Sequence, residues 1–410
     1  MLIQYSVKNY RSIKDEVVIN FSAMGKNIDY GKVITEDGLE YPVYKCIGLL
    51  GPNASGKSNI IASLLFALRF INSTIERKEK SKIKTEMFML DKESREDASS
   101  FEFIFFERQR KYVYGFTVDT ECVLEEYLLA YYSKKATTVF EREREKYNFR
   151  GNDVKIQTEI SKKTNANRLY LPVAAEWGYE KVKTPYKWFE KMYRQYSDMN
   201  ISQVIADVLE REPLKEILLE ALAKADFNIK NIYVKSRKME KRHRDALISF
   251  LTQLVGEGEA LEDLIPEDTP RIWITHAAQG GETFDIELNE DSSGTRDLID
   301  NIAELLFISE EGGLFVEDEF GRNYHTKLTE YFIGLFNDNS VSKGKAQLFF
   351  SAHDTKILKL LNPEQIYLVD KDEDSATYVK LLDDYLIREK DNIELGYLKG
   401  RYGAIPNIKG

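Results

Sequence analysis

One stretch of the sequence has the residue types and spacing that hold phosphate. Residues 51–58, GPNASGKS, match the pattern GxxxxGK[ST] of a phosphate-binding P-loop. Glycines let backbone N–H groups turn toward phosphate oxygens, and a helix that begins at the loop adds the partial positive charge of its N-terminus. Lys57 would reach the β- and γ-phosphates of ATP, and Ser58 would hold Mg²⁺. The predicted nucleotide contacts here are Asn53, Ala54, Ser55, Gly56, Lys57, Ser58 and Asn59.

The flanking residues predict the strand and the helix that such a loop needs. Residues 46–50, CIGLL, have the length and apolar character of a buried strand. Beyond the loop, apolar residues recur at helical spacing, namely Ile60, Ile61, Leu64, Leu65, Leu68 and Ile71. A chance match in a glycine-rich turn would lack this strand and helix, so the context favours a real phosphate site.

A second apolar run ends in three carboxylates. Residues 314–316, LFV, precede Glu317, Asp318 and Glu319. At the C-terminal end of a strand, where α/β sheets bind phosphates, Asp318 would order Mg²⁺ and Glu319 would polarise the attacking water. A charge at Glu317 must be solvated or paired, because burying it alone would cost several kcal/mol. Glu317 therefore stays open as an alternative catalytic carboxylate.

Two more segments could contact a phosphate. Residues 291–296, DSSGTR, precede an apolar helical stripe, and a serine hydroxyl, a glycine and a helix N-terminus together form an anion site. Ser292 or Ser293 acting as a helix N-cap would explain the same residues without ATP. Residues 347–354, QLFFSAHD, form an apolar strand that ends in His353, which could instead be a structural histidine.

In this order, the motifs resemble those of ABC-type ATPase heads, the class that includes SMC and RecF proteins. The resemblance implies that Ser293, Gly294 and Thr295 close on the γ-phosphate bound by a second subunit. It also implies a catalytic Glu319 and a His353 imidazole that contacts the γ-phosphate.

The N-terminal segment extends the resemblance. Residues 1–21 read as a β-hairpin whose turn, residues 9–13, resembles the Asn-Phe-Arg-Ser-like turn beside the nucleotide in these heads. That would place Arg11 and Ser12 near the phosphates, although a plain surface turn remains the alternative. Three departures from the pattern are the charged Glu317, the atypical residues 321–325 after the carboxylates, and the absence of the usual magnesium-contacting glutamine near residues 87–91.

The signature form SSGT and the segment GRYGAIP at residues 400–406 resemble ATPases of bacterial phage-defence operons, including the RloA/AbiL type and the PARIS ATPase. This resemblance implies ATP and Mg²⁺ as cofactors, and assembly of the chain with itself as a dimer or higher homo-oligomer. It further implies a sensor or regulator that controls a separately encoded effector protein. The alternative is a RecF- or SMC-like DNA-repair ATPase that binds duplex DNA, so nucleic acid stays a possible partner.

The expected fold is α/β: a P-loop NTPase of the ABC-ATPase-head type with a mixed sheet, an antiparallel β subdomain and an inserted helical domain. In the mixed sheet, the P-loop, carboxylate and histidine strands should lie side by side. Polar residues 73–100, strongly basic from Lys78 to Lys84, should form loops and turns before the antiparallel strands. The expected domains are residues 1–173, 174–268 and 269–410.

Two charged clusters have competing interpretations. Six basic residues between 235 and 244 could grip DNA or an acidic partner, but a solvated helical face is the favoured interpretation. They are Lys235, Arg237, Lys238, Lys241, Arg242 and Arg244. Asp370, Asp372 and Asp374 could mimic a metal site, but a solvated turn is favoured.

The amino-acid composition narrows the class of protein to which the chain can belong. The chain has 410 residues, 43% hydrophobic and 31% charged, which is typical of a globular protein. A net charge of −10 argues against a protein coated in nucleic acid. Two cysteines and four scattered histidines give no disulfide framework or zinc spacing, so we expect a reducing, cytoplasmic setting. No stretch approaches the ~18 apolar residues of a membrane helix, and we expect no membrane contact.

Overall fold

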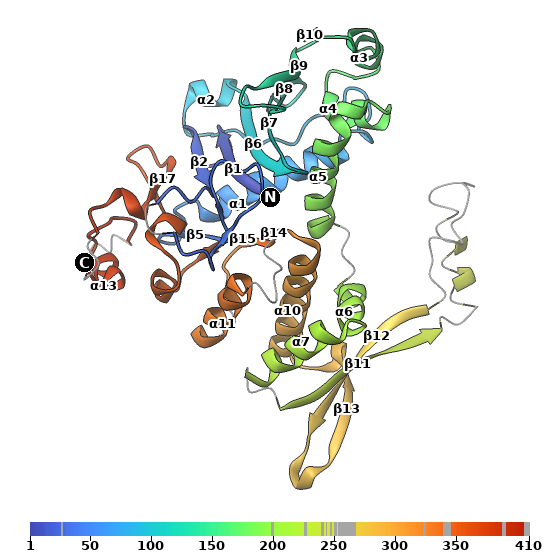
Figure 1. Cartoon of the computed structure of the whole chain (residues 1–410), viewed down its shortest axis with the longest axis vertical. Coiled ribbons are helices and arrows are strands. Elements are labelled where there is room, and N and C mark those ends of the chain that lie inside the picture. The colour runs from blue at the N-terminus through green and yellow to red at the C-terminus, as the bar shows by residue number, and fades with distance from the viewer. Residues whose placement is uncertain are drawn as a thin grey trace. The chain divides into compact units, whose positions relative to one another are not determined.

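The computed structural model shows two compact units, Met1–Ser197 with Ile308–Gly410, and Asp198–Phe307 (Figure 1). The structure describes residues 1–25, 28–197, 201–224, 228–238, 242, 244–246, 248–249, 252, 268–322, 325–338, 346–387 and 391–405.

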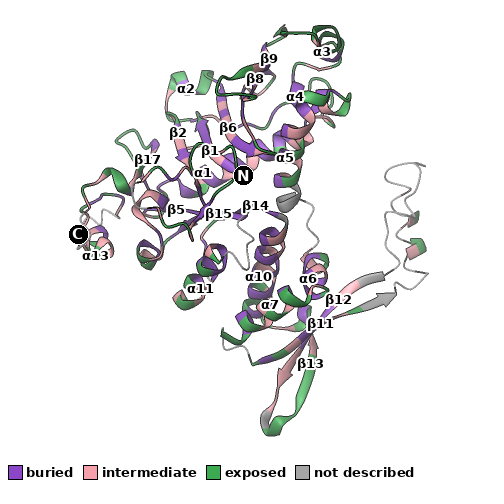
Figure 2. Cartoon of the chain, in the orientation of Figure 1, coloured by how far each residue is buried: buried purple, intermediate pink, exposed green. Residues whose placement is uncertain are grey.

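The first unit contains the mixed sheet that the motifs predict. Its strands, in spatial order, are β14 (Gly313–Glu317), β15 (Ala346–Ala352), β5 (Cys46–Leu50), β16 (Ile366–Lys371) and β17 (Thr377–Leu381). The first four are parallel, and β17 runs antiparallel to β16. β5 and β15 are buried along their whole length, as strands covered on both faces must be (Figure 2). The α/β class and the side-by-side placement of the three motif strands are confirmed.

A seven-stranded antiparallel sheet forms the predicted β subdomain. Its order is β10 (Lys146–Asn148), β9 (Thr137–Glu143), β8 (Val123–Ala130), β7 (Arg110–Val118), β6 (Ser99–Glu107), β1 (Leu2–Lys8) and β2 (Val17–Asn20). β1 and β2 are the predicted N-terminal hairpin, and β1 pairs with β6. Burial alternates along most of β6, which indicates one face on the core.

Helix α1 (Lys57–Ser73) contacts both β15 and β1, so it joins the two sheets of the first unit. Helix α5 (Glu180–Ser197) packs on α1 and β6, where the Trp188 ring stacks on Phe105 at 4.3 Å. The remaining elements of this unit are β3 (Val33–Ile34), β4 (Val43–Tyr44), α2 (Lys92–Glu96), α3 (Val154–Ser161), α4 (Tyr170–Glu176), α11 (Thr326–Asn337), α13 (Ile393–Leu398), and the 3-10 helices η3 (Thr355–Lys359), η4 (Pro363–Gln365) and η5 (Leu382–Asp384).

The second unit combines helices with a three-stranded antiparallel sheet. Strand β12 lies between β11 and β13, and helices α6 and α7 pack on β11 (Figure 1). Gly280 and Gly281, in the turn between β12 and β13, both have positive φ, as the predicted hairpin requires. The elements are α6 (Ile201–Leu209), α7 (Glu212–Lys224), β11 (Ile229–Lys238), β12 (Asp268–Ala277), η1 (Gln279–Gly281), β13 (Thr283–Glu287), η2 (Leu288–Glu290) and the start of α10 (Ser293–Glu311).

Two features differ from the sequence-based expectations, and a third expectation is not tested. The basic residues Lys235–Lys238 lie in strand β11 rather than on a helical face, because β11 pairs with β12 through nine residue pairs. The compact units also do not coincide with the predicted boundaries at 173/174 and 268/269. Aromatic packing keeps α5 with the first unit, and pairing with β11 keeps β12 and β13 with the second. The spacing of Leu247, Phe250, Leu251, Leu254 and Val255 in the sequence predicts a further helix, but these residues lie outside the described ones.

A buried ion pair anchors α4 to the seven-stranded sheet. The Glu126 carboxylate is fully buried on β8 and lies 3.5 Å from the Arg142 guanidinium. It also accepts hydrogen bonds from the N–H groups of Tyr170 (2.6 Å) and Leu171 (2.8 Å) in the first turn of α4. Burial raises the pKa of the Glu126 carboxyl, although Arg142 and these N–H groups lower it.

None of the helices in the described part of the chain is long and apolar enough to cross a membrane.

We expect Glu126→Ala to lower the free energy of unfolding by about 3–5 kcal/mol, because it leaves the buried Arg142 guanidinium without its counter-charge and two buried N–H groups without their acceptor. Urea titration followed by circular dichroism measures the change. Glu125→Ala, at an exposed position on the same strand, is the control and should change stability little. Equal losses in the two variants would show that the buried pair has no special role.

Candidate active site

The loop between β5 and α1 has the backbone that a phosphate cradle requires. Ala54 and Gly56 have positive φ, of 63° and 112°. A Cβ at Gly56 would lie 2.0 Å from the Thr377 Oγ1, so only glycine fits. The Lys57 ammonium is buried and donates to the carbonyls of Gly51 (2.7 Å) and Pro52 (2.9 Å). The lysine therefore curls back on its own loop.

The charge on Lys57 is only partly compensated. Burial lowers the pKa of the Lys57 ammonium, and the nearby Asp318 and Glu319 carboxylates oppose that shift. An ammonium that has lost hydration and bonds only to neutral carbonyls would gain from an anion. Residues of the loop thus fit a phosphate on electrostatic grounds.

Other loop positions fit a nucleotide as well. Asn53, Ala54 and Ser58 are exposed at the mouth of the loop, and Asn59 is half-buried. The Ser55 hydroxyl is buried and has no hydrogen-bond partner in the described part of the chain. Such an orphaned group points to a missing partner, which a phosphate oxygen or water would supply. The N-terminus of α1 behind it is open to a ligand.

Ser12 ties the N-terminal turn to the loop. Its hydroxyl accepts from Asn59 Nδ2 (2.6 Å) and lies 2.8 Å from Thr377 Oγ1, and Thr377 donates in turn to the Ser55 carbonyl (2.9 Å). Ser12 is thus brought to the loop, where it supports the backbone. The motif gave no signal for Thr377, which follows the β16–β17 turn.

Arg11 is held by a carboxylate in this structure. Its guanidinium lies 2.8 Å from the Glu86 carboxylate, which raises the pKa of Arg11, and its φ is 50°. Arg11, Ser12 and Asn59 line a cavity of about 550 Å³ together with residues 85–90. In that segment, where a magnesium-contacting glutamine was missing from the sequence, the side chains of Met89 and Leu90 are exposed and apolar.

Ser351, on β15, organises the carboxylates that follow β14. Its hydroxyl donates to Asp318 Oδ1 at 2.5 Å and accepts from the Glu319 N–H at 2.8 Å. The Glu319 backbone has a φ of 60°, a strained value for a residue with a side chain. Sequence analysis passed over Ser351, although it is a small hydroxyl residue at the end of an otherwise apolar strand.

The Glu319 carboxylate lies between the side chains of Arg322 and His353. One oxygen pairs with the exposed Arg322, and the other is 3.6 Å from His353 Nε2. The structure therefore brings Glu319 and His353 together at the C-terminal ends of β14 and β15. Arg322 lies in the atypical segment 321–325, to which the sequence assigned no role. Asn323 and Tyr324 of that segment lie outside the described residues.

Glu317 is half-buried at the end of β14. Burial, together with the neighbouring Asp318 carboxylate, raises its pKa to about 7. No hydrogen bond or ion pair joins the Glu317 carboxyl to any residue that the structure describes. The carboxyl group therefore avoids the cost of unpaired burial by holding its proton near neutral pH.

The signature residues lie in the second unit, at the N-terminus of α10. Ser292 Oγ accepts from the Thr295 N–H (3.2 Å), so Ser292 is the N-cap, and Thr295 is buried. Asp291 accepts from the Ser292 N–H (2.6 Å) and lies 2.7 Å from His276 Nε2 on β12. Ser293 and Gly294 are exposed, and outside the helix's own backbone no atom of the described residues lies within 4 Å of a Cβ built at Gly294. Ser292 therefore acts as the N-cap, while Ser293 and Gly294 stay exposed beside it.

Two carboxylates of the acidic turn at residues 370–374 accept hydrogen bonds from backbone N–H groups. Asp370 accepts from the Ala404 N–H (3.1 Å), and Asp372 accepts from the Ala376 N–H (2.8 Å). Within the described ranges, no group of three histidine, cysteine or acidic residues is placed to hold a metal ion. Residues 400–405 thus pack on this turn, while Pro406 lies outside the described residues.

Glu317 yields a pH-dependent prediction for protein free of nucleotide and Mg²⁺. Because its pKa is raised in the folded state, the folded protein binds this proton more tightly, and stability falls as pH rises from about 4.5 to about 7. Glu317→Gln removes that loss and should stabilise the protein by about 2–3 kcal/mol at pH 8 but little at pH 5. Thermal melts at both pH values measure it, with exposed Glu330→Gln as the control. A gain that is the same at both pH values would contradict the assignment.

No curated protein matches the chain. The chain is similar to the solved structure described as "SmcHead bound to the C-winged helix domain of ScpA", at 13% identity and a TM-score of 0.46, over 92% of this chain and 96% of that one. It is also similar to an SMC head domain from Thermotoga maritima, at 13% identity and a TM-score of 0.40, over 93% and 98%. Residues 46–359, from β5 to the segment after the histidine strand, match the model of one protein family. The chain therefore belongs to the family described as "AAA domain, putative AbiEii toxin, Type IV TA system".

Proposed function

We propose that this protein binds and hydrolyses Mg-ATP at a site completed by a second copy of the chain. One observation carries the proposal: Lys57, Asp318, Glu319 and His353 project from the same ends of three adjacent parallel strands or from the helix that follows. That is the edge at which α/β sheets bind phosphorylated ligands. Membership of an AAA-domain family supports the same chemistry.

The loop residues would hold the phosphates. Lys57 would exchange its two carbonyl acceptors for phosphate oxygens, which satisfy its charge better. Backbone N–H groups from Asn53 to Lys57 and the N-terminus of α1 would receive the remaining oxygens. Ser58 and Asp318 would hold Mg²⁺, whose charge neutralises the phosphates during transfer. The cavity beside Ser12 and Asn59 has room for part of the nucleotide.

Glu319 and His353 would act at the γ-phosphate. Glu319 would accept a proton from the attacking water, and its strained backbone is held by Ser351. To do so, the carboxylate has to give up its pairing with Arg322, an exposed contact that is weak. His353, 3.6 Å away, would contact the γ-phosphate. Glu317 is the alternative base, and its raised pKa suits proton transfer near neutral pH.

The signature residues support the second-copy requirement. Ser293 and Gly294 are exposed at the start of a 19-residue helix, with space above the glycine for an approaching phosphate. We infer that they close on ATP held by a partner copy, giving a dimer or an assembly of dimers. The description of the family as a putative AbiEii toxin of a toxin–antitoxin system supports a role in phage defence. There, the ATP state would hold or release a separately encoded effector.

A DNA-repair role is the second candidate. It is favoured by the basic residues of β11, where exposed Lys235 lies 4.5 Å over the Trp273 ring. If this strand grips duplex DNA, affinity should fall steeply with salt, and glutamates at Lys235, Arg237 and Lys238 should abolish it. Gel-shift titrations at two salt concentrations measure it. DNA binding that is unchanged by salt and by the glutamate substitutions would remove the main support for this role.

We expect Lys57→Ala to remove nucleotide binding, because the ammonium is the main side-chain charge facing the phosphates. The readout is the rise in Tm on adding Mg-ATP, measured alongside the melt without nucleotide to check the fold. Lys92→Ala, at an exposed position, is the control and should keep the wild-type rise. An undiminished rise in Lys57→Ala would count against the loop as the site.

Glu319→Gln should keep ATP affinity, since amide and carboxylate are nearly isosteric and Asp318 remains. Turnover should drop on the order of a hundredfold or more, the scale of a lost general base. The ATP-bound form should then accumulate as a dimer or higher assembly in light scattering. Normal turnover would move the catalytic role to Glu317.

Gly294→Gln tests closure in the same assay. The chain itself leaves open space at this position, so the variant should fold and bind ATP, yet block assembly in the Glu319→Gln background. Gly334→Gln is a matched control on α11, because it is also exposed and also has no atom within 4 Å of a new Cβ. Assembly that proceeds without ATP, or despite Gly294→Gln, would sink the composite site.

A further inference from the structure

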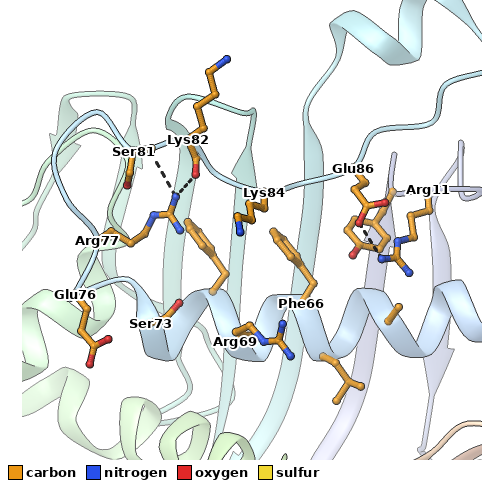
Figure 3. Close-up of a pocket in the computed structure, with 14 residues that line it drawn as sticks. Arg11, Phe66, Arg69, Ser73, Glu76, Arg77, Ser81, Lys82, Lys84 and Glu86 are labelled. Atoms are coloured by element: carbon orange, nitrogen blue, oxygen red, sulfur yellow. Dashed lines mark hydrogen bonds and ion pairs between the residues drawn. The ribbon is translucent and has the colours of Figure 1, made fainter. Parts of the chain in front are cut away.

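A cavity of about 710 Å³ lies along the outer face of α1, away from the loop residues 51–58 (Figure 3). Helix α1 forms its floor, and residues 76–86 cross over it as a strap. Figure 3 shows Arg69 on the helix and Lys84 on the strap reaching into the same space, between Phe66 and Arg77. Its volume is within the range of about 300–1,000 Å³ that is usual for small-ligand sites.

The cavity is cationic in a chain whose net charge is −10. Its lining carries five basic side chains and two carboxylates, and one carboxylate, Glu86, is already paired with Arg11. The side chains of Arg69 and Lys84 form no ion pair or hydrogen bond with any residue in the described ranges. The lining carries three more basic than acidic side chains, and this excess favours an anionic occupant.

Two buried donors also lack an acceptor. The Arg77 guanidinium donates through Nη2 to the Lys82 carbonyl (2.5 Å) and lies 5.4 Å over the Phe70 ring, but its Nε is buried and unpaired. The Nε of Arg11, at the other end of the cavity, is likewise buried and unpaired. Burial lowers the pKa of Arg77. Buried donors in native proteins almost always have partners, and a ligand oxygen or a water would complete both groups.

Between these cations lies a rigid aromatic surface. The Phe66 ring is half-buried and stacks on Phe70 at 6.0 Å, with the ring planes 1° apart. Tyr10 (5.4 Å) and Phe101 (5.4 Å) hold it from the side of the core. A fixed ring beside several cations suits a flat aromatic base that carries phosphate.

We propose that this cavity binds a second nucleotide, a free nucleoside phosphate, with its phosphate on Arg69, Arg77 and Lys84 and its base against Phe66. The site is separate from the one at residues 51–58 and does not depend on hydrolysis there. Arg11 and Glu86 line both this cavity and the smaller one beside Ser12 and Asn59. An occupant that draws Arg11 from Glu86 would therefore be felt at the turn that supports the loop.

The test is calorimetric titration of Lys57→Ala protein, in which binding at residues 51–58 is removed, with GMP, UMP and pyrophosphate. At least one nucleotide should bind with one site per chain. Arg69→Gln with Lys84→Gln should weaken the nucleotide and pyrophosphate by roughly tenfold or more, because both need the cations. Phe66→Leu should weaken only the nucleotide, and its unchanged pyrophosphate binding doubles as a check on folding. Lys78→Gln, exposed on the same segment but outside the cavity, is the control.

Wild-type protein saturated with Mg-ADP provides the second measurement if Lys57→Ala does not fold. No binding of any of the three probes at millimolar concentration would overturn the proposal. So would nucleotide binding that the Arg69 and Lys84 changes leave intact. A preference for duplex DNA or an acidic peptide that Lys78→Gln weakens as much as the cavity variants would also overturn it, because it would show a general polyanion surface.

Discussion

The parallel pairing of β14, β15 and β5 is the constraint on which the candidate active site depends. Its register sets Glu317 opposite Phe350, and Ala352 opposite Leu50, so the three strands end at one edge. Because parallel strands require separate crossover connections, residues more than 250 positions apart in sequence meet there. Ser351, on the middle strand, then bonds to both Asp318 and Glu319 and sets their positions relative to the loop.

The charged groups at this edge have only weak partners in this structure. The Lys57 ammonium donates to neutral carbonyls, the Glu319 carboxylate pairs with the exposed Arg322, and the Glu317 carboxyl holds its proton near neutral pH. Each of these arrangements is a substitute for a stronger interaction that a phosphate or Mg²⁺ would supply. The free energy gained when they are exchanged would be available for positioning the attacking water. In a site of this kind the backbone is already in place, and the bound ligand would neutralise the charged side chains.

Sequence patterns could predict the parts of this arrangement that depend on local residue order. The glycine loop, the apolar strands and the carboxylates predicted three adjacent strands correctly. Ser351 and Thr377 were missed because their role comes from contacts between distant segments, which leave no local signal. Strand β11 was misread as a helical face because its pairing with β12 overrides the helical preference of a lysine- and arginine-rich run. The bounds of the second unit likewise depend on packing between elements, which the hydrophobic periodicity of the sequence does not predict.

Mixing two inactive variants shows whether one site is shared between two copies of the chain. Lys57→Ala disables the phosphate-binding loop but keeps the signature residues. Gly294→Gln keeps the loop but disables the signature residues. If a site takes its loop from one copy and its signature from another, random mixing of dimers restores one intact site in half of them, or about a quarter of the wild-type turnover. ATP hydrolysis by the mixture, measured by phosphate release against each variant alone, gives the result. Turnover no greater than the sum of the separate variants would contradict the account.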